Sequence, residues 1–281
     1  MAVVNLTDTP KKSAGREFWN SNPCGGKWAS YREFMEWYRT VEPYMYDTVS
    51  RQSWKNRRVL EVGCGQGPLA NYLPSLGATV VGMDMSDASL RRAAEGKREL
   101  GNDALTLMHA DAEKLPFADA SFDSVVSFGV LHHTPDTDGA VQEVRRVLKP
   151  GGTATVMLYR TGNPKWWATA VLRSLGQARD RRREARNRIA DRARDQHGVN
   201  DTRGTALLEL FGVPTLKAYS NREALAMFRG FSTVEIRNVQ PGFLRMADII
   251  PALQPVAPVL GWIDSRFAGW WGFYQVIEAR R

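Results

Sequence analysis

The chain has 281 residues, of which 43% are hydrophobic and 24% charged, a balance typical of a globular protein with one large domain or one core with additions. The sequence has no apolar stretch long enough to cross a bilayer and no secretory signal pattern, and its two cysteines make neither a disulfide framework nor a metal set. We therefore expect a cytoplasmic protein without a metal site, whose net charge of +8 raises the question of an anionic partner.

The first 56 residues divide into a tail and a helical cap. Residues 1–15 have the composition of a loose polar tail. In residues 16–56, aromatic and charged residues recur at helical spacing, which places Phe34, Trp37 and Tyr38 on one helical face. We therefore expect 1–56 to be a tail followed by helices that cover the rest of the fold.

Strand-like and helix-like runs then alternate over residues 57–159. Pro68 near the start of one helix-like run, Pro74 and Gly77 near its end, and Ser86 as the N-cap of the next are local boundary signals. Alternation of this kind predicts an α/β fold with a parallel sheet covered on both faces. The predicted strands are 57–63, 78–84, 104–110, 121–130 and 153–159, and the predicted helices are 68–77, 86–100 and 136–148, the last ended by the KPGG sequence at 149–152.

After residue 159 the alternation is interrupted twice. Residues 160–217 form an insertion, expected to be helical, and a helix at 220–230 and a strand at 231–239 follow it. A second, aromatic insertion occupies 241–271 before a last strand at 272–281. The C-terminal part of the core, 218–281, brings the expected sheet to seven strands in a Rossmann-like, doubly wound arrangement.

Positive charge and tryptophan are concentrated in the added segments. Residues 173–194 hold nine arginines and three acidic residues, a pattern of a solvated helix face or, alternatively, of a nucleic-acid-binding stripe or the rim of an anionic substrate site. All nine tryptophans lie outside 57–159, so the additions either have their own core or build a hydrophobic chamber. Trp262, Trp270 and Trp271 also suit a membrane interface, although we expect buried packing for them.

The loop at residues 63–67 has glycine at three of its five positions, between a strand and a helix. Glycines let the backbone approach a ligand closely, and the helix N-terminus offers unpaired N–H groups. A dinucleotide fingerprint would need glycine or alanine where Pro68 stands, and no P-loop pattern occurs. The loop therefore fits neither of these two nucleotide-binding patterns.

Four elements in order closely resemble the class I S-adenosylmethionine-dependent methyltransferases. They are LEVGCGQG, VVGMDMS, the stretch from Met108 to His133, and VLKPGG before a strand. The likeness covers residues 57–159 and is nearest to the small-molecule branch that includes ubiquinone and menaquinone biosynthesis methyltransferases. It implies a methyltransferase that uses S-adenosylmethionine as its cofactor.

The resemblance implies roles for individual residues. The carboxylate of Asp84, at the end of the second strand, would accept hydrogen bonds from the ribose hydroxyls. Met85 would lie against adenine, Asp111 would accept its amino group, and the backbone of the glycine loop would contact the methionine part. The full expected cofactor-binding set is Glu61, Gly63, Cys64, Gly65, Gln66, Gly67, Asp84, Met85, Ala110, Asp111, Ala112, Phe128 and Gly129.

Methyl transfer from a sulfonium is an in-line displacement that needs positioning and exclusion of water, and a base only when the acceptor loses a proton. His132 and His133 follow the fourth strand, which in an open parallel sheet points at the ligand crevice. We expect His133, then His132, as the base, and Tyr38 as a residue that orients the acceptor. Structural packing is the alternative for each.

The expected acceptor is a small, largely hydrophobic metabolite, and arginines near the chamber would favour an acidic one. The alternatives are methylation of RNA or another nucleic acid, and a non-methylating reaction such as cyclisation on the same fold. No Asp-Pro-Pro-Tyr-type sequence follows the fourth strand, which argues against methylation of base amino groups. The sequence specifies neither the methylated atom nor the oligomeric state.

Overall fold

The structure is a computed structural model that describes residues 9–23, 28–163, 166–167, 170, 213–243 and 251–281. The expected insertion at 160–217 lies largely outside these residues, and with it the arginines of 173–194.

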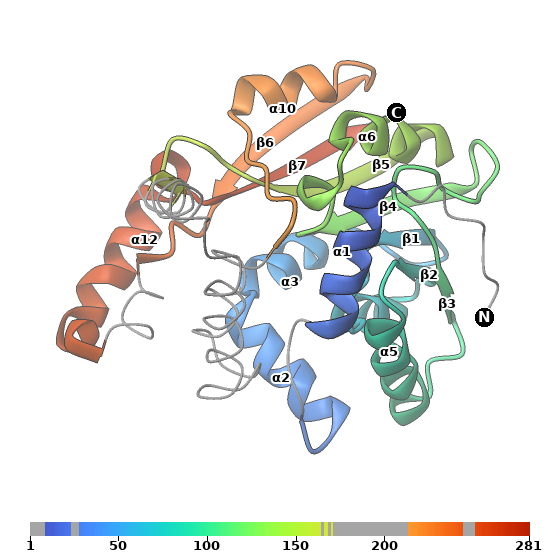
Figure 1. Ribbon diagram of the computed structural model, residues 1–281, viewed down its shortest axis with the longest axis horizontal. Coiled ribbons are helices and arrows are strands. Elements are labelled where there is room, and N and C mark those ends of the chain that lie inside the picture. The colour runs from blue at the N-terminus through green and yellow to red at the C-terminus, as the bar shows by residue number, and fades with distance from the viewer. Residues whose placement is uncertain (1–8, 24–27, 164–165, 168–169, 171–212, 244–250) are drawn as a thin grey trace.

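A single seven-stranded sheet forms the centre of the fold, in the order β3-β2-β1-β4-β5-β7-β6 (Figure 1). The first five strands pair in parallel, and β7 pairs antiparallel with both β5 and β6. The strands are β1 (Arg58–Val62), β2 (Thr79–Asp84), β3 (Leu105–His109), β4 (Phe122–Phe128), β5 (Leu148–Tyr159), β6 (Thr233–Val239) and β7 (Tyr274–Arg280). The expected α/β, mostly parallel, seven-stranded sheet is confirmed.

Helices cover the sheet, and most of them begin and end at the residues that the sequence indicates. Ser86 caps α5 by accepting a hydrogen bond from the Ser89 amide at 3.2 Å, and Gly77 ends η1 in the left-handed conformation. The described helices are α1 (Pro10–Ser21), α2 (Tyr31–Val41), α3 (Pro43–Ser50), α4 (Pro68–Tyr72), η1 (Leu73–Leu76), α5 (Asp87–Leu100), η2 (Leu131–His133), α6 (Thr137–Val147), α10 (Asn221–Met227), η3 (Pro251–Val256) and α12 (Ala257–Trp271).

Three local predictions were wrong. Residues 10–15 are not a loose tail, because α1 begins at Pro10 with Thr9 as its N-cap. The KPGG sequence at 149–152 ends α6 but lies within β5, where the pairing with β4 shifts in register between Phe122 and Ser124. The expected buried packing of Trp262, Trp270 and Trp271 is not found: they are 60%, 77% and 38% exposed on a fifteen-residue helix, α12, which follows η3 and has no buried residue.

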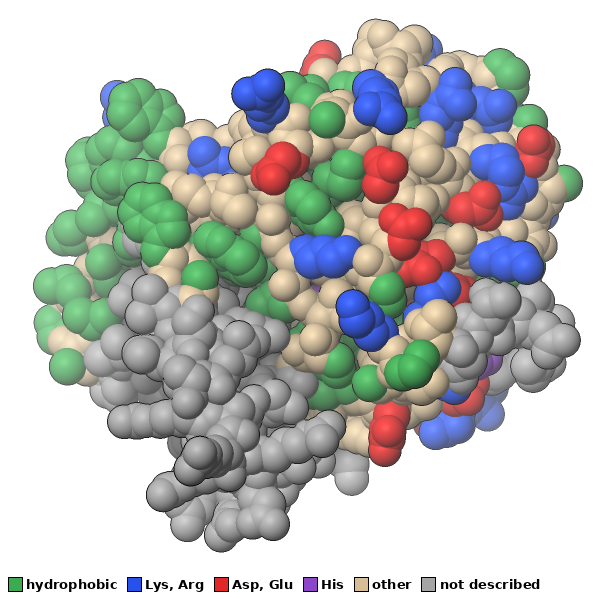
Figure 2. Space-filling view, turned by 45° about the horizontal axis from the view of Figure 1, so that its top comes forward, with side chains coloured by type: hydrophobic (Ala, Val, Ile, Leu, Met, Phe, Trp, Pro, Cys, Tyr) green, Lys and Arg blue, Asp and Glu red, His purple; other side chains and the backbone are tan. Residues whose placement is uncertain are grey.

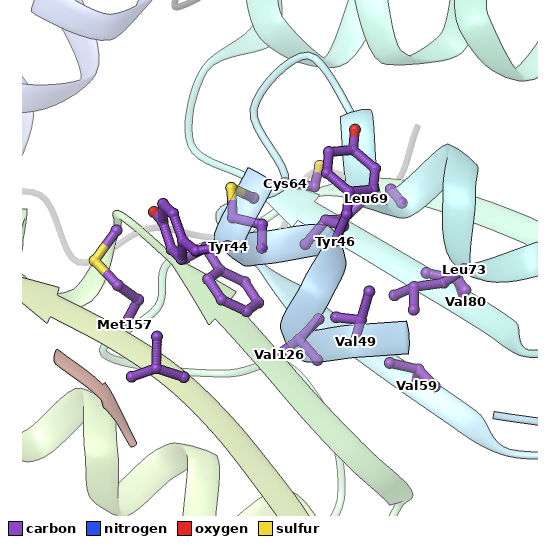
Figure 3. Close-up of a cluster of buried hydrophobic side chains, with 14 of the residues drawn as sticks. Tyr44, Tyr46, Val49, Val59, Cys64, Leu69, Leu73, Val80, Val126 and Met157 are labelled. Atoms are coloured by element: carbon purple, nitrogen blue, oxygen red, sulfur yellow. The ribbon is translucent and has the colours of Figure 1, made fainter. Parts of the chain in front are cut away.

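Two hydrophobic clusters pack on the two faces of the sheet. One joins α3 and α4 to alternate residues of β1, β2 and β4, as Figure 3 shows for Tyr46, Val59 and Val126. The other joins α6 and α10 to the intervening strand residues, among them Leu60 and Val125. Because side chains alternate along a strand, the nearly continuous apolar strands supply both faces. The parallel strands then end together at one edge of the sheet, which carries the glycine loop, Asp84, Phe128 and Tyr159.

Candidate functional site

The glycine loop after β1 is held against β2 by its backbone. The amides of Gly63 and Cys64 both donate to the Met83 carbonyl at 2.8 Å. Gly63, Gly65 and Gly67 all have φ between +54° and +79°, which strongly favours glycine.

The three glycines of the loop meet different surroundings. A Cβ atom at Gly63 would lie 2.2 Å from a Val130 methyl carbon, and one at Gly67 would lie 2.8 Å from the Ala93 Cβ. A Cβ at Gly65 would meet nothing within 4 Å. Gly63 and Gly67 are therefore required by internal packing, whereas Gly65 leaves open space in front of its backbone.

Asp84 ends β2 beside this open space. Its Oδ2 accepts from the Gly65 amide and its Oδ1 from the Ser86 amide, both at 2.8 Å. Burial raises the pKa of the Asp84 carboxyl, and the two amides oppose that shift. A carboxylate has about four lone-pair positions, so Asp84 keeps accepting capacity for ligand hydroxyls.

Glu61 and Cys64 lie beneath the loop rather than on its open side. Their side chains are only 3% and 2% exposed. Burial, followed by the neighbouring Asp84, raises the pKa of Glu61 well above its usual value, and burial likewise raises that of the Cys64 thiol. Burial thus disfavours the charged form of both groups, and Cys64 supplies backbone to the loop.

Tyr31 of the N-terminal cap supports the loop from the side. Its hydroxyl donates to the Gln66 carbonyl at 2.7 Å and accepts from Asn71 Nδ2 at 3.0 Å. The fully buried ring fills a gap that Gly96 leaves in α5, where a Cβ would lie 2.3 Å from the ring. This contact links the cap to the middle of the glycine loop.

The end of β3 carries the residues expected at adenine. Asp111 Oδ1 accepts from the Glu113 amide at 2.9 Å, and its Oδ2 lies 2.5 Å from Lys12 Nζ of α1. Lys12 also pairs with Glu113 at 2.6 Å. Met85 is half-buried, and its carbonyl lies 2.8 Å from His109 Nε2. Ala110 is buried and Ala112 half-buried beside this group.

Helix α1 lies across the same edge of the sheet (Figure 1). Its last turn meets the start of α5, where Ser86 Oγ donates to the Trp19 carbonyl at 3.1 Å and the Ala88 amide donates to Asn20 Oδ1 at 3.3 Å. Sequence analysis missed Lys12 because it treated the start of α1 as a tail, and it gave Trp19, in the predicted helical cap, no role. The Thr9–Pro10 pair, an N-cap followed by proline at the first helical position, was the signal available.

His133 lies where α1 meets η2. Its ring centroid is 5.3 Å from that of Trp19, in an edge-on contact, and its Nδ1 lies 2.9 Å from the Thr215 carbonyl. Because a carbonyl only accepts, Nδ1 carries the proton and the neutral ring has its lone pair on Nε2. The contact with Thr215 thus sets the tautomer that a general base needs.

His132 and Tyr38 occupy different surroundings. The His132 side chain is fully buried and packs on Tyr159, with ring centroids 3.9 Å apart. Burial, followed by the neighbouring His133, lowers the pKa of His132 well below its usual value. The Tyr38 ring contacts Phe34 and Trp37 of its own helix. Of the three expected catalytic residues, His132 is buried, His133 is half-buried, and Tyr38 belongs to the aromatic packing of α2.

Aromatic rings gather beside the histidines at the ends of β4, β5 and β7. Phe128, buried at the end of β4, lies 6.2 Å from Tyr44 of α3, which lies 5.0 Å from Tyr274. Tyr159 contacts Tyr274 and also Phe273, at 5.5 and 4.7 Å. Gly129, with a φ of +76°, turns the chain from β4 toward η2.

Part of the chain matches a family of known proteins. Residues 60–156 match the family described as "Methyltransferase domain". The chain is 37% identical over 131 residues to the ubiquinone biosynthesis O-methyltransferase of Dinoroseobacter shibae, covering 46% of this chain and 51% of that protein. It is 35% identical over 168 residues to 24-methylenesterol C-methyltransferase 2 of Oryza sativa, covering 57% and 44%. The chain thus spans about half the length of these relatives.

Solved structures agree on the fold. The S-adenosylmethionine-dependent methyltransferase of Mesorhizobium loti superposes with a TM-score of 0.54 at 19% identity, over 85% of this chain and 96% of that one. The [4+2]-cyclase SpnF superposes with a TM-score of 0.56 at 19% identity, over 100% and 99%. At this identity the likeness concerns the fold alone.

Proposed function

Starting from residues 60–156 as an S-adenosylmethionine-dependent methyltransferase domain, we propose that this chain transfers a methyl group from S-adenosylmethionine to a small, largely hydrophobic metabolite. One observation carries the proposal: the open backbone of Gly65, the carboxylate of Asp84 and the ring of His133 lie along one edge of the sheet.

The residues of this edge fit the cofactor. The space in front of Gly65 admits the methionine part close to the backbone, and the remaining lone pairs of Asp84 suit the two ribose hydroxyls. Met85, Asp111 and Ala112 line the position of adenine, with Lys12 holding the Asp111 carboxylate in place. The remaining members of the expected set support this site from the loop and the ends of β3 and β4: Glu61, Gly63, Cys64, Gln66, Gly67, Ala110, Phe128 and Gly129.

The bound cofactor would supply an electrophilic methyl group, so the protein has to orient the acceptor and exclude water. Helix α1 lies across this edge, where Trp19 and Lys12 attach it to the core. His133 Nε2 would take the proton of a hydroxyl or amine acceptor, since Thr215 holds the opposite nitrogen protonated. His132 is a packing residue that holds the His133 backbone against β5.

The acceptor is proposed from two kinds of support. The buried aromatic residues Tyr44, Tyr159 and Phe273 pack together at the end of the sheet beyond His133, and a largely apolar acceptor would bind beside them. Three relatives are named as a ubiquinone biosynthesis O-methyltransferase, a 24-methylenesterol C-methyltransferase and a fatty-acid O-methyltransferase. We also propose that the acceptor carries an acidic group, because the arginines of residues 173–194, which lie outside the described residues, would attract one.

Mass spectrometry of a cell extract tests the proposal. The extract is incubated with the protein and deuteromethyl-labelled cofactor, and a product heavier by one labelled methyl group is expected in the small-molecule fraction. A labelled product in the RNA fraction instead would select the nucleic-acid alternative. Cofactor binding without any labelled product would contradict methyl transfer and favour a non-methylating reaction.

Two variants separate binding from chemistry. Asp84→Ala should abolish measurable binding of S-adenosylhomocysteine by calorimetry, whereas Asp87→Ala, which removes the same charge three residues later, should leave the affinity within about twofold. His133→Gln should keep cofactor affinity and lower kcat on the identified acceptor by about 10²- to 10⁴-fold. Normal turnover by His133→Gln would show that the acceptor needs no base from this residue.

A further inference from the structure

Helix α12 differs from the other described helices in what it exposes to solvent. Nine of its fifteen residues are Ala, Val, Leu, Ile, Phe or Trp, yet none of the fifteen is buried. The helix extends beside the body of the fold, away from α10 (Figure 1). A helix this apolar normally packs in a core or contacts a membrane, so its exposure needs an explanation.

The most exposed residues form one stripe, which we call the α12 stripe. It consists of Val259, Trp262, Arg266 and Trp270, which follow one another at steps of three, four and four residues and so share one face of the helix. Val259 is 56% exposed, Trp262 60% and Trp270 77%. Figure 2 shows the hydrophobic side chains gathered at the edge of the molecule where α12 lies.

The rest of the helix is turned toward the body and attached to it. Asp264, its one acidic residue, accepts from the Phe243 amide at 2.9 Å. Asn238 of β6 donates to the Gly269 carbonyl at 2.9 Å, and Arg160 donates to the Trp270 carbonyl at 2.8 Å. The orientation of α12 is therefore set by polar contacts, and these contacts leave the α12 stripe facing outward.

We propose that the α12 stripe binds a lipid bilayer with anionic headgroups, with the helix lying in the plane of the interface. Tryptophan combines a large apolar ring with an N–H group that stays near water, which suits the headgroup region. Arg266 is the only charged residue of the stripe, and its long side chain reaches headgroup phosphates while the rings enter the acyl boundary. The one acid of the helix is turned away from the stripe, toward the Phe243 amide, so it does not oppose the attraction of Arg266 to anionic headgroups.

A second copy of the chain fits the stripe less well. Arg266 stands at the centre, four residues from Trp262 on one side and four from Trp270 on the other. A two-fold contact centred on the stripe would bring the two Arg266 guanidinium groups together without an acidic partner from either helix. A surface of headgroup phosphates supplies the missing negative charge.

The C-terminal end of α12 lies close to the aromatic group beside the histidines, so membrane binding could deliver an apolar acceptor to the site. Two residues beyond Trp271, the Phe273 ring is buried and lies 4.7 Å from Tyr159, within the aromatic group beside the histidines. The bilayer would then lie next to the acceptor end of the site, from which an apolar metabolite could enter without crossing water. This last step rests on the proposed function, whereas lipid binding itself does not.

Co-sedimentation with vesicles tests the inference. Full-length protein is mixed with vesicles of phosphatidylcholine containing phosphatidylglycerol, or of phosphatidylcholine alone. We expect binding that is stronger to the anionic vesicles, and a partition coefficient that falls by about tenfold for each tryptophan removed in Trp262→Ala and Trp270→Ala. Arg266→Gln should reduce the preference for anionic vesicles. Leu225→Ala, a change at a residue of α10 that is 47% exposed, serves as the control and should bind as the original chain does.

Two results would overturn the inference. Vesicle binding that is absent, or equal in the double variant Trp262→Ala/Trp270→Ala and the original chain, would show that the stripe does not bind lipid. A dimer in analytical ultracentrifugation that these two changes dissociate would assign the stripe to a second copy of the chain. Calorimetry with S-adenosylhomocysteine on the same variants keeps the two proposals apart, because cofactor affinity should stay unchanged whatever the vesicles show.

Discussion

Tyr31→Phe tests whether the N-terminal cap holds the glycine loop. The change removes only the hydroxyl that donates to the Gln66 carbonyl at 2.7 Å, at a fully buried position. Asn71 Nδ2 loses one acceptor but retains the Gly67 and Ala93 carbonyls, both at 3.2 Å. The cost is therefore the loss of the donor to a buried carbonyl, about 1–3 kcal/mol in the free energy of unfolding.

The assay is urea unfolding with linear extrapolation, paired with calorimetry of S-adenosylhomocysteine. Because Gln66 stands between Gly65 and Gly67, we expect cofactor affinity to fall by about three- to tenfold together with the stability. Tyr46→Phe is the matched control: its hydroxyl is also buried but has no hydrogen-bond partner among the described residues, so its removal should be neutral or stabilising. Equal effects of the two changes on stability, or unchanged cofactor affinity in Tyr31→Phe, would refute this reasoning.

Three further predictions concern the loop, α1 and α6. Gly63→Ala should lower the free energy of unfolding by about 2–4 kcal/mol, because the added methyl group meets Val130. Gly65→Ala should lower it by only about 1–2 kcal/mol but should weaken cofactor binding more than tenfold. Urea unfolding measures the stability and calorimetry the binding, and equal losses of stability in the two variants would contradict the distinction. Lys12→Met leaves two carboxylates facing each other without their cation, so limited proteolysis should cut α1 faster than in the original chain, and equal rates would argue against the anchor. The hydrogen bond from Arg146 lowers the pKa of Glu143 below its usual 4.5, so the pair stabilises the fold above that pH and the stabilisation is lost as the pH falls through the lowered pKa. The difference in unfolding free energy between the original chain and Glu143→Gln should therefore shrink between pH 7 and pH 3. A difference that does not change with pH would refute the assignment.

The sequence alone determined the fold class because its signals are local. Alternating strands and helices predict a parallel sheet whatever the tertiary detail, and proline, glycine and serine mark helix ends through their own backbone preferences, as Pro68, Gly77 and Ser86 do. The acidic residue at the end of β2 was assigned for the same reason, since parallel strands end at a common edge. The one local signal that was overlooked, Thr9 before Pro10, was equally available.

Only the tertiary structure decided why each site residue is needed. Gly63 and Gly65 look alike in the sequence, yet one avoids Val130, 67 residues away, and the other leaves a ligand space open. His132 and His133 are adjacent, and only the distant Tyr159 and Thr215 distinguish a buried packing residue from an oriented base. The exposure of the α12 stripe likewise depends on which face its contacts with β6 turn outward. Contacts between residues far apart in the chain leave no periodic pattern in the sequence, so the roles that they create appear only when the chain is folded.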